Sequence, residues 1–353
     1  MIFMNIYYFV FAASIFIKSL LPILLKKTGN MNILLQSLLI TLIEFIIASI
    51  LYVSTKRTYD KKYGELIKQS FINKNVIIDS ILIFAVFLLS FFSIKKLPIS
   101  ISLSFIAFTP LIMMGIEKIF KNLLPSSFSS SNNYWKTQFI GDLIIAIGGL
   151  FIIFSKTKLT HFEIFFYTFL LFLSNVFASI SSLRDKNEVL NIQKEVRTPT
   201  KEKSSIINQI NFITEFQISL YPIIIVIFSI LYSATYLPII RKIFPKISGQ
   251  NLSVKEIGLF ILSTIFIIYV PYILNTISSL HIQDNIFFIM KNLKILYGFI
   301  LGYIFFGEII GKFKLIGGGI IIAGIIVLII LTRKDKKKDL TINSHIKKIT
   351  FHN

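Results

Sequence analysis

The chain of 353 residues contains no cysteine, which excludes disulfide bonds, thiolate nucleophiles and cysteine-ligated metal centres. Its four histidines are scattered and do not have the spacing of a metal site. No P-loop, GxSxG or HExxH motif occurs either. We therefore expect no catalytic residue, no metal and no cofactor, and we do not expect an enzyme.

Acidic residues are scarce. The 17 aspartates and glutamates stand against 37 lysines and arginines, which gives a formal net charge of +20. Most of the basic residues flank apolar segments, as they do at the ends of membrane spans. A/T-biased codons would also produce part of the lysine excess. The charge therefore does not indicate a nucleic-acid partner.

Long apolar segments, in contrast, fill the chain. It is 54% hydrophobic and has a mean hydropathy of +0.76, whereas soluble domains are about 45–50% apolar. A helix needs about 20 apolar residues to cross a hydrocarbon core of ~30 Å. The sequence predicts an all-α membrane protein in a lipid bilayer with ten transmembrane helices, numbered here as runs 1 to 10: 2–25, 32–54, 75–94, 98–117, 138–155, 161–183, 206–233, 255–280, 286–307 and 313–332.

Two glycine-rich runs indicate an internal repeat. Run 5 contains GDLIIAIGGLFIIF and run 10 contains GGGIIIAGIIVLII. Each follows a run with a glycine and a glutamate near its end, first Gly115 and Glu117, then Gly307 and Glu308. Five helices per half would give the two halves opposite topology. Inverted repeats of this kind are typical of transporters that bind substrate near the membrane midplane, between the halves.

The predicted boundaries follow from this repeat. Residues 1–155 form the first five-helix repeat, and residues 156–332 form the second, which includes a charged loop at 184–205. Residues 333–353 form a basic tail that is predicted to be disordered. The side of the membrane that holds the termini and the even-numbered loops carries 22 basic residues, against 12 on the other side. The positive-inside rule therefore places both termini in the cytosol.

Charged side chains within the runs are the candidate functional residues. Each costs about 2.5–3.5 kcal/mol at the centre of a membrane helix. Such residues persist where they are paired, reach the interface or line a wet cavity. The five that we select as candidates are Lys18, Glu44, Glu215, Lys291 and Lys294.

Lys291 and Lys294 are three residues apart and share a helix face that continues through Gly298 and Gly302. Lysine supplies a compact positive charge with three donors, which suits phosphate. We therefore expect Lys294, with Lys291, to bind an anionic group of a substrate. The alternative is that both lysines snorkel to the membrane surface. Tyr297 lies near this face and could stack on a base or sugar, or pack in the core.

Glu44 lies near the centre of run 2 and has three interpretations. It could pair with a lysine across a cavity, take up and release a proton, or form a structural pair with no role in binding. Glu215 could also bind substrate, although the polar residues around it could mark a wet helix end. Lys18 could contribute to the same site or reach the opposite membrane interface.

The glycines favour a structural interpretation. Gly298 and Gly302 form a GxxxG pattern, and Gly317 and Gly318 open run 10. Small residues at such spacing most often allow two membrane helices to approach closely. We expect these four glycines to lie at helix–helix contacts.

In several features the chain resembles the drug/metabolite transporter superfamily of ten-helix (EamA-like) carriers. These features are the ten runs in two halves of five, the pair Thr109-Pro110 in run 4, and the closing stretch FFGEIIGKFKLIGGGIIIAGIIVLI at 305–329. The nucleotide-sugar and triose-phosphate branch is the most similar one. As in that branch, a basic residue, Lys294, lies fourteen positions before Glu308 near the end of run 9.

Run 6 adds to the resemblance, because SNVFASISSLRDK (174–186) is similar to the sixth helix of the sugar-phosphate carriers. At two positions where those carriers usually have a further basic residue, this chain has Ile106 and Ile295. Carriers of amines, amino acids and other metabolites in the same superfamily therefore remain open.

The resemblance implies a secondary active antiporter that works by alternating access. Its substrate would be a small anion, such as a nucleotide sugar or a sugar phosphate, exchanged across a Golgi, ER or other organelle membrane. A homodimer is compatible with it. The alternatives are an exporter of small amines, amino acids or drugs, and, from another class, a membrane-embedded enzyme or assembly factor.

Overall fold

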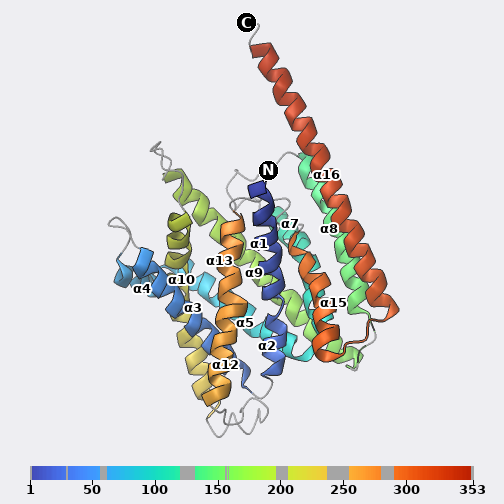
Figure 1. The fold of residues 1–353 in the computed structure, drawn as a ribbon. Helices are drawn as coiled ribbons and strands as arrows, with labels where there is room; N and C mark the ends of the chain where they lie inside the picture. Colours follow the sequence, from blue (N-terminus) through green and yellow to red (C-terminus); the bar gives the residue numbers. More distant parts are fainter. Residues whose placement is uncertain are drawn as a thin grey trace.

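The computed structural model describes residues 2–28, 31–55, 62–119, 132–155, 157, 159–195, 206–236, 254–279 and 290–350. Within these ranges every regular element is a helix, as the sequence predicts for an all-α protein. The beginning of α1 and the end of α16 lie at the same end of the bundle, and α16 extends beyond it (Figure 1). The elements in chain order are α1 (Ile2–Lys18), α2 (Leu21–Lys27), α3 (Ile33–Thr55), α4 (Tyr63–Ile72), α5 (Lys74–Lys96), α6 (Ile99–Ser104), the 3₁₀ helix η1 (Phe105–Phe108), α7 (Thr109–Ile119), α8 (Asn132–Ile153), α9 (His161–Glu195), α10 (Ile206–Ala234), α12 (Val254–Thr264), the π helix η3 (Ile265–Tyr269), α13 (Val270–Ser279), α15 (Leu293–Phe306) and α16 (Lys312–Thr350).

The outer surface of the bundle is apolar. On α9, Phe162, Phe166 and Phe169 are exposed on successive turns of one helix face. A soluble protein rarely exposes apolar patches of this kind, because water does not solvate them, whereas lipid tails do. Polar side chains lie on the opposite, inner side. On α3 the buried polar residues are Gln36, Ser37, Thr41 and Glu44.

Eight helical stretches in the described residues are long and apolar enough to cross a membrane. Together with the apolar outer surface, they identify the chain as an integral multi-pass membrane protein. The described helices of runs 5 and 9 are shorter apolar segments, Phe139–Ile153 and Leu293–Phe306. The eight long stretches are Ile6–Lys27, Ile33–Thr55, Lys74–Lys96, Ile99–Ile116, His161–Ser181, Thr214–Ala234, Lys255–Asn275 and Lys312–Leu331.

Two segments that the sequence predicts to be irregular are helical instead. The helix α9 continues to Glu195, into the predicted loop 184–205, and α16 continues to Thr350, through most of the predicted tail. Both segments contain lysines, and the first also contains Glu188 and Glu195; lysine and glutamate are good helix formers. Adding such residues to an existing helix avoids the cost of nucleation, so a membrane helix can extend beyond its apolar part. Residues 196–205 lie outside the described part of the chain.

Three helices are interrupted or carry a proline near their middle. Pro110 and Pro271 cannot donate to the carbonyl four residues earlier. In run 4 the Thr109 amide donates to the Ile106 carbonyl within a 3₁₀ turn. In run 8 the Val270 amide donates to the Ile265 carbonyl at the end of the π helix. The 3₁₀ and π turns therefore keep the backbone amide groups beside these prolines hydrogen-bonded. This matters because the interior of a bilayer has no water that could bond to them instead. The third proline, Pro222, lies inside α10.

Helices from the predicted halves pack against each other throughout the bundle. Two hydrogen bonds from the start of the 174–186 stretch contribute to this packing. The Ser174 hydroxyl donates to the Val86 carbonyl at 3.2 Å, and the Asn175 amide nitrogen donates to the Phe105 carbonyl at 3.3 Å. By runs, the helix pairs between halves are 1 with 8 and 9, 2 with 7 and 8, 3 with 6 and 7, 4 with 6 and 9, and 5 with 10.

At two glycines the backbones of runs 5 and 10 approach each other closely. A Cβ atom on Gly317 would lie 2.5 Å from the Gly148 carbonyl oxygen, and a Cβ atom on Gly148 would lie 2.7 Å from the Gly317 carbonyl oxygen. Because these are backbone atoms, a side chain at either position would push α8 and α16 apart. Gly318 instead faces the ring of Phe299, whose nearest atom would lie 3.3 Å away.

We predict that Gly317→Ala destabilises the protein in detergent by about 1–3 kcal/mol, because the added methyl group overlaps a backbone carbonyl. This loss exceeds the ~0.5–1 kcal/mol that a glycine-to-alanine change contributes within a helix. Gly319→Ala is the matched control, since a Cβ atom there would meet nothing within 4 Å. Thermal unfolding measures both. Equal melting temperatures for the two variants would contradict this account of the α8–α16 contact.

Candidate functional site

Four of the five charged residues identified within the runs come together in the interior. Lys18 ends α1, Glu44 lies within α3, and Lys291 and Lys294 lie just before and in the first turn of α15. Lys18 interacts electrostatically with Glu44, with Lys291 and with Lys294. Lys294 also interacts with Lys291. We call these four residues the charge cluster. Its members come from both predicted halves.

The lysines of the charge cluster are not fully packed. Lys18, Lys291 and Lys294 are each half-buried, and Glu44, with which Lys18 interacts, is only 7% exposed. Each lysine therefore retains some accessible surface. With three lysines and one glutamate, the basic groups of the cluster outnumber its acidic one.

Glu44 is held by groups from the second half of the chain. The Tyr221 hydroxyl on α10 forms a hydrogen bond with its carboxylate. The Gln217 amide nitrogen, one turn earlier on α10, lies 3.5 Å from that hydroxyl. Tyr269, the last residue of η3, is near enough to interact with the Glu44 charge. The Oε2 atom of Glu44 and the Oε1 atom of Gln217 are buried and accept no hydrogen bond from any described residue. Two buried acceptors thus remain available on Glu44 and Gln217.

Interrupted helices place these tyrosines. Tyr221 immediately precedes Pro222, and Tyr269 lies two residues before Pro271. A π turn adds one residue to a helix and therefore changes which face the following turns present to their neighbours. Sequence reasoning did not select Tyr221, Tyr269 or Gln217. A tyrosine one or two residues before a proline in an otherwise apolar run is the signal that could have identified the first two.

Tyr297 and Glu215, the other two candidates, lie at the margins of the charge cluster. The Tyr297 ring packs edge-on against Phe16 of α1, with centroids 5.2 Å apart and an interplanar angle of 86°. Glu215 accepts a hydrogen bond from the Tyr52 hydroxyl at 3.4 Å. Tyr52 lies eight residues after Glu44 on α3, which is about 12 Å along the helix. Tyr297 therefore joins α1 to α15, and Glu215 lies toward one end of the bundle.

The described residues contain no group of three histidines, aspartates or glutamates that could hold a metal ion. The chemistry that the charge cluster supports is the binding of a charged group, with hydroxyl and amide groups available for further hydrogen bonds. Lysine ammonium groups attract anions, and buried acceptors without partners attract donors.

Comparison with known proteins yields a similarity of fold alone. No family model and no curated protein matches this chain. Eleven chains of solved structures match it. One of them, described only as the crystal structure of a protein, has a TM-score of 0.52 and 12% sequence identity, and the similarity covers 94% of this chain and 98% of that chain. Nearly the whole helical arrangement therefore occurs in another protein of very different sequence.

Removing a positive charge from the charge cluster and removing its negative charge should change the stability of the protein in opposite directions. Lys294→Met removes an ammonium group that repels Lys18 and Lys291, so we expect it to raise the free energy of unfolding in detergent by about 1–2 kcal/mol. Glu44→Gln removes the negative charge that offsets those lysines, so we expect a decrease of similar size. Thermal unfolding of the purified variants measures both changes.

Lys255→Met is the control for this prediction, because Lys255 is exposed at the beginning of α12. Its effect should stay within about 0.5 kcal/mol. A stabilising Glu44→Gln, or a destabilising Lys294→Met, would contradict the proposed balance of charges.

Proposed function

We propose that this chain is a secondary active transporter of the drug/metabolite type that exchanges a small phosphorylated or nucleotide-linked metabolite across an organelle membrane. The observation that carries the proposal is the charge cluster, because its groups come from both halves of the chain and lie inside a bundle with an apolar outer surface. Ionisable groups kept at such cost within a membrane protein are typical of substrate pathways.

The helix contacts support ten crossings arranged as two inverted repeats. If each run is exchanged with the run five places away, the contact of run 1 with run 8 becomes that of run 6 with run 3, and both occur. The same exchange relates the pairs 1–9 and 4–6, and the pairs 2–8 and 3–7. The pairs 2–7, 4–9 and 5–10 map onto themselves. A pseudo-two-fold relation between two five-helix units has this consequence.

An anionic substrate fits the excess of positive charge in the cluster. Lys291 and Lys294 would bind a phosphate group as point charges with several donors. The partnerless acceptors of Glu44 and Gln217 would accept hydrogen bonds from substrate hydroxyl or amino groups. A metabolite with a phosphate at one end and hydroxyl groups at the other could bind both the lysines and the acceptors of Glu44 and Gln217. A small amine would satisfy Glu44 but would be repelled by the three lysines.

Transport would then proceed by alternating access. The halves would rock about the bound substrate, so that the charge cluster meets water from one side of the membrane at a time. Charged and partly hydrated lysines are disfavoured in an empty, closed site, and a bound anion would reduce this cost. Exchange of one anion for another is therefore favoured over net uptake.

The direct test is counterflow in proteoliposomes that contain the purified chain. Vesicles preloaded with nucleotide sugars, sugar phosphates, amino acids or amines are compared for uptake of the same labelled compound. We expect exchange with a phosphate-bearing compound and none with simple amines. Counterflow with amines alone would favour the exporter, and absence of counterflow with every class would refute transport of these compounds.

Within this assay, Lys294→Ala should reduce exchange by about tenfold or more, since loss of a charge-assisted contact of roughly 1.5–3 kcal/mol corresponds to such a factor. Lys294→Arg should retain most of the activity, because it keeps the positive charge. Lys255→Ala is the control for loss of an exposed lysine. Full exchange by Lys294→Ala would exclude Lys294 from substrate binding.

A further inference from the structure

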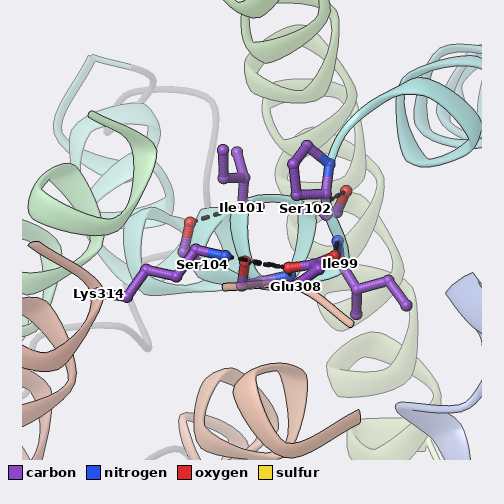
Figure 2. Close-up of polar contacts among 8 residues, drawn as sticks. Ile99, Ile101, Ser102, Ser104, Glu308 and Lys314 are labelled. Carbon is purple, nitrogen blue, oxygen red and sulfur yellow. Dashed lines mark hydrogen bonds and ion pairs between the residues drawn. The ribbon is translucent and has the colours of Figure 1, made fainter. Parts of the chain in front are cut away.

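Glu308 joins two segments that lie more than 200 residues apart in the sequence. It follows α15, and its carboxylate accepts hydrogen bonds from the Ile99 amide, from the Ser100 amide at 3.3 Å and from the Ser100 hydroxyl at 2.6 Å. Lys314 adds an ion pair at 3.2 Å. Figure 2 shows Glu308 between Lys314 and the start of α6. The Glu308 side chain is 12% exposed and that of Lys314 is 4% exposed.

Two glycines create this contact. Gly307 has φ of 60°, a left-handed conformation that favours glycine and ends α15 by turning the chain back on itself. The Glu308 amide then donates to the Gly302 carbonyl at 3.1 Å. A Cβ atom on Gly302 would lie 2.9 Å from the Glu308 carboxylate, so the absence of a side chain there makes room for it. We expected Gly302 to lie at a contact between two helices; instead it makes room for the carboxylate of Glu308, which follows the same helix.

An apolar cluster separates the Glu308 contact from the charge cluster. It consists of Ile23 on α2, Ile99 and Leu103 on α6, and Leu301 on α15. Along α15, Lys294 comes first, Leu301 follows, and Glu308 comes last. Along run 1, the order is again Lys18, then Ile23, then the end of α2. Leu103 packs on α15, where a Cβ atom on Gly298 would lie 3.1 Å from the Leu103 Cβ atom.

Glu163 is a second carboxylate that caps a helix, but its contacts are local. Glu163 caps the N-terminus of its own helix, α9, where it accepts hydrogen bonds from the Thr160 amide at 3.0 Å and the Thr160 hydroxyl at 2.9 Å. This is a local capping box, formed by residues three apart. Glu308 instead caps a helix of the other half. Its loss would weaken the contact of α6 with α15 and α16, whereas the loss of Glu163 would affect one helix end.

We propose that Glu308 is the latch of a gate: its carboxylate holds α6 against α15 and α16, closes this end of the bundle over the apolar cluster, and must release α6 for substrate to pass. The inference rests on the proposed transport function for its role in turnover. The closed gate itself is a property of the protein without substrate. The hydrogen bonds and ion pair of Glu308 are directional, so they can form again in one geometry after the gate has opened. An apolar contact alone would not specify that geometry.

The latch can be tested by the reactivity of one introduced cysteine, because the natural chain has none. Leu103→Cys places a thiol in the apolar cluster, and alkylation by a water-soluble maleimide in detergent reports how often this end opens. We expect slow labelling in the parent background and about tenfold faster labelling with Glu308→Gln, which loses the charge-assisted contacts. Lys314→Met, which removes only the ion pair, should give a smaller increase.

Glu163→Gln is the matched control and should leave the labelling rate unchanged. Fast labelling of Leu103→Cys in the parent, or the same rate with and without Glu308→Gln and Lys314→Met, would overturn the latch. An equal increase with Glu163→Gln would show general loosening and would overturn it as well. None of these outcomes depends on knowing the substrate, so they are distinct from a failure of the proposed transport.

A disulfide tests whether the gate must open during turnover. Leu103→Cys combined with Gly298→Cys brings two Cβ atoms near the ~3.5–4.5 Å separation of natural disulfides. Oxidation should block counterflow, and reduction should restore it to the rate of the reduced double variant. Undiminished exchange by the oxidised protein would refute the gate while leaving transport in place.

Discussion

Lys18, Lys291, Lys294 and Glu44 can stay inside a bundle surrounded by lipid only if protein groups or water solvate them, and this requirement organises the interior. The lysines retain accessible surface, and Glu44 is hydrogen-bonded by Tyr221. The outer faces of the same helices carry large exposed apolar side chains. A soluble protein would place these two kinds of group the other way round, because its solvent is water.

Prolines and glycines adapt otherwise regular helices to this interior. Pro110, Pro222 and Pro271 interrupt or mark the helices that border the centre, and the 3₁₀ and π turns beside two of them keep backbone groups paired. Glycines act where two backbones meet, as at Gly148 and Gly317, or where a carboxylate needs room, as at Gly302. The same residue type thus supports a rigid contact in one place and a polar closure in another.

Periodicity and local composition predicted the helical class and the positions of the apolar helices, because an apolar run of membrane length leaves the backbone few alternatives. The same local reasoning was wrong about residues 184–195 and most of the tail, where charged sequence continues an existing helix. Lys18, Glu44, Lys291 and Lys294 could be selected as candidates because charge is costly in lipid. Tyr221, Tyr269 and Gln217 could not, since their importance depends on lying opposite Glu44.

The sequence by itself determined that this is a helical membrane protein and which of its side chains are too costly to face lipid, because both properties depend on local composition. Only the tertiary structure decided that Lys18 on α1 lies close enough to interact both with Glu44 on α3 and with Lys291 and Lys294 at the start of α15. It also decided that Glu308 caps the first turn of α6, which lies more than 200 residues earlier in the chain. Both arrangements depend on contacts between residues far apart in the chain. A local sequence pattern does not determine how close such residues lie in space.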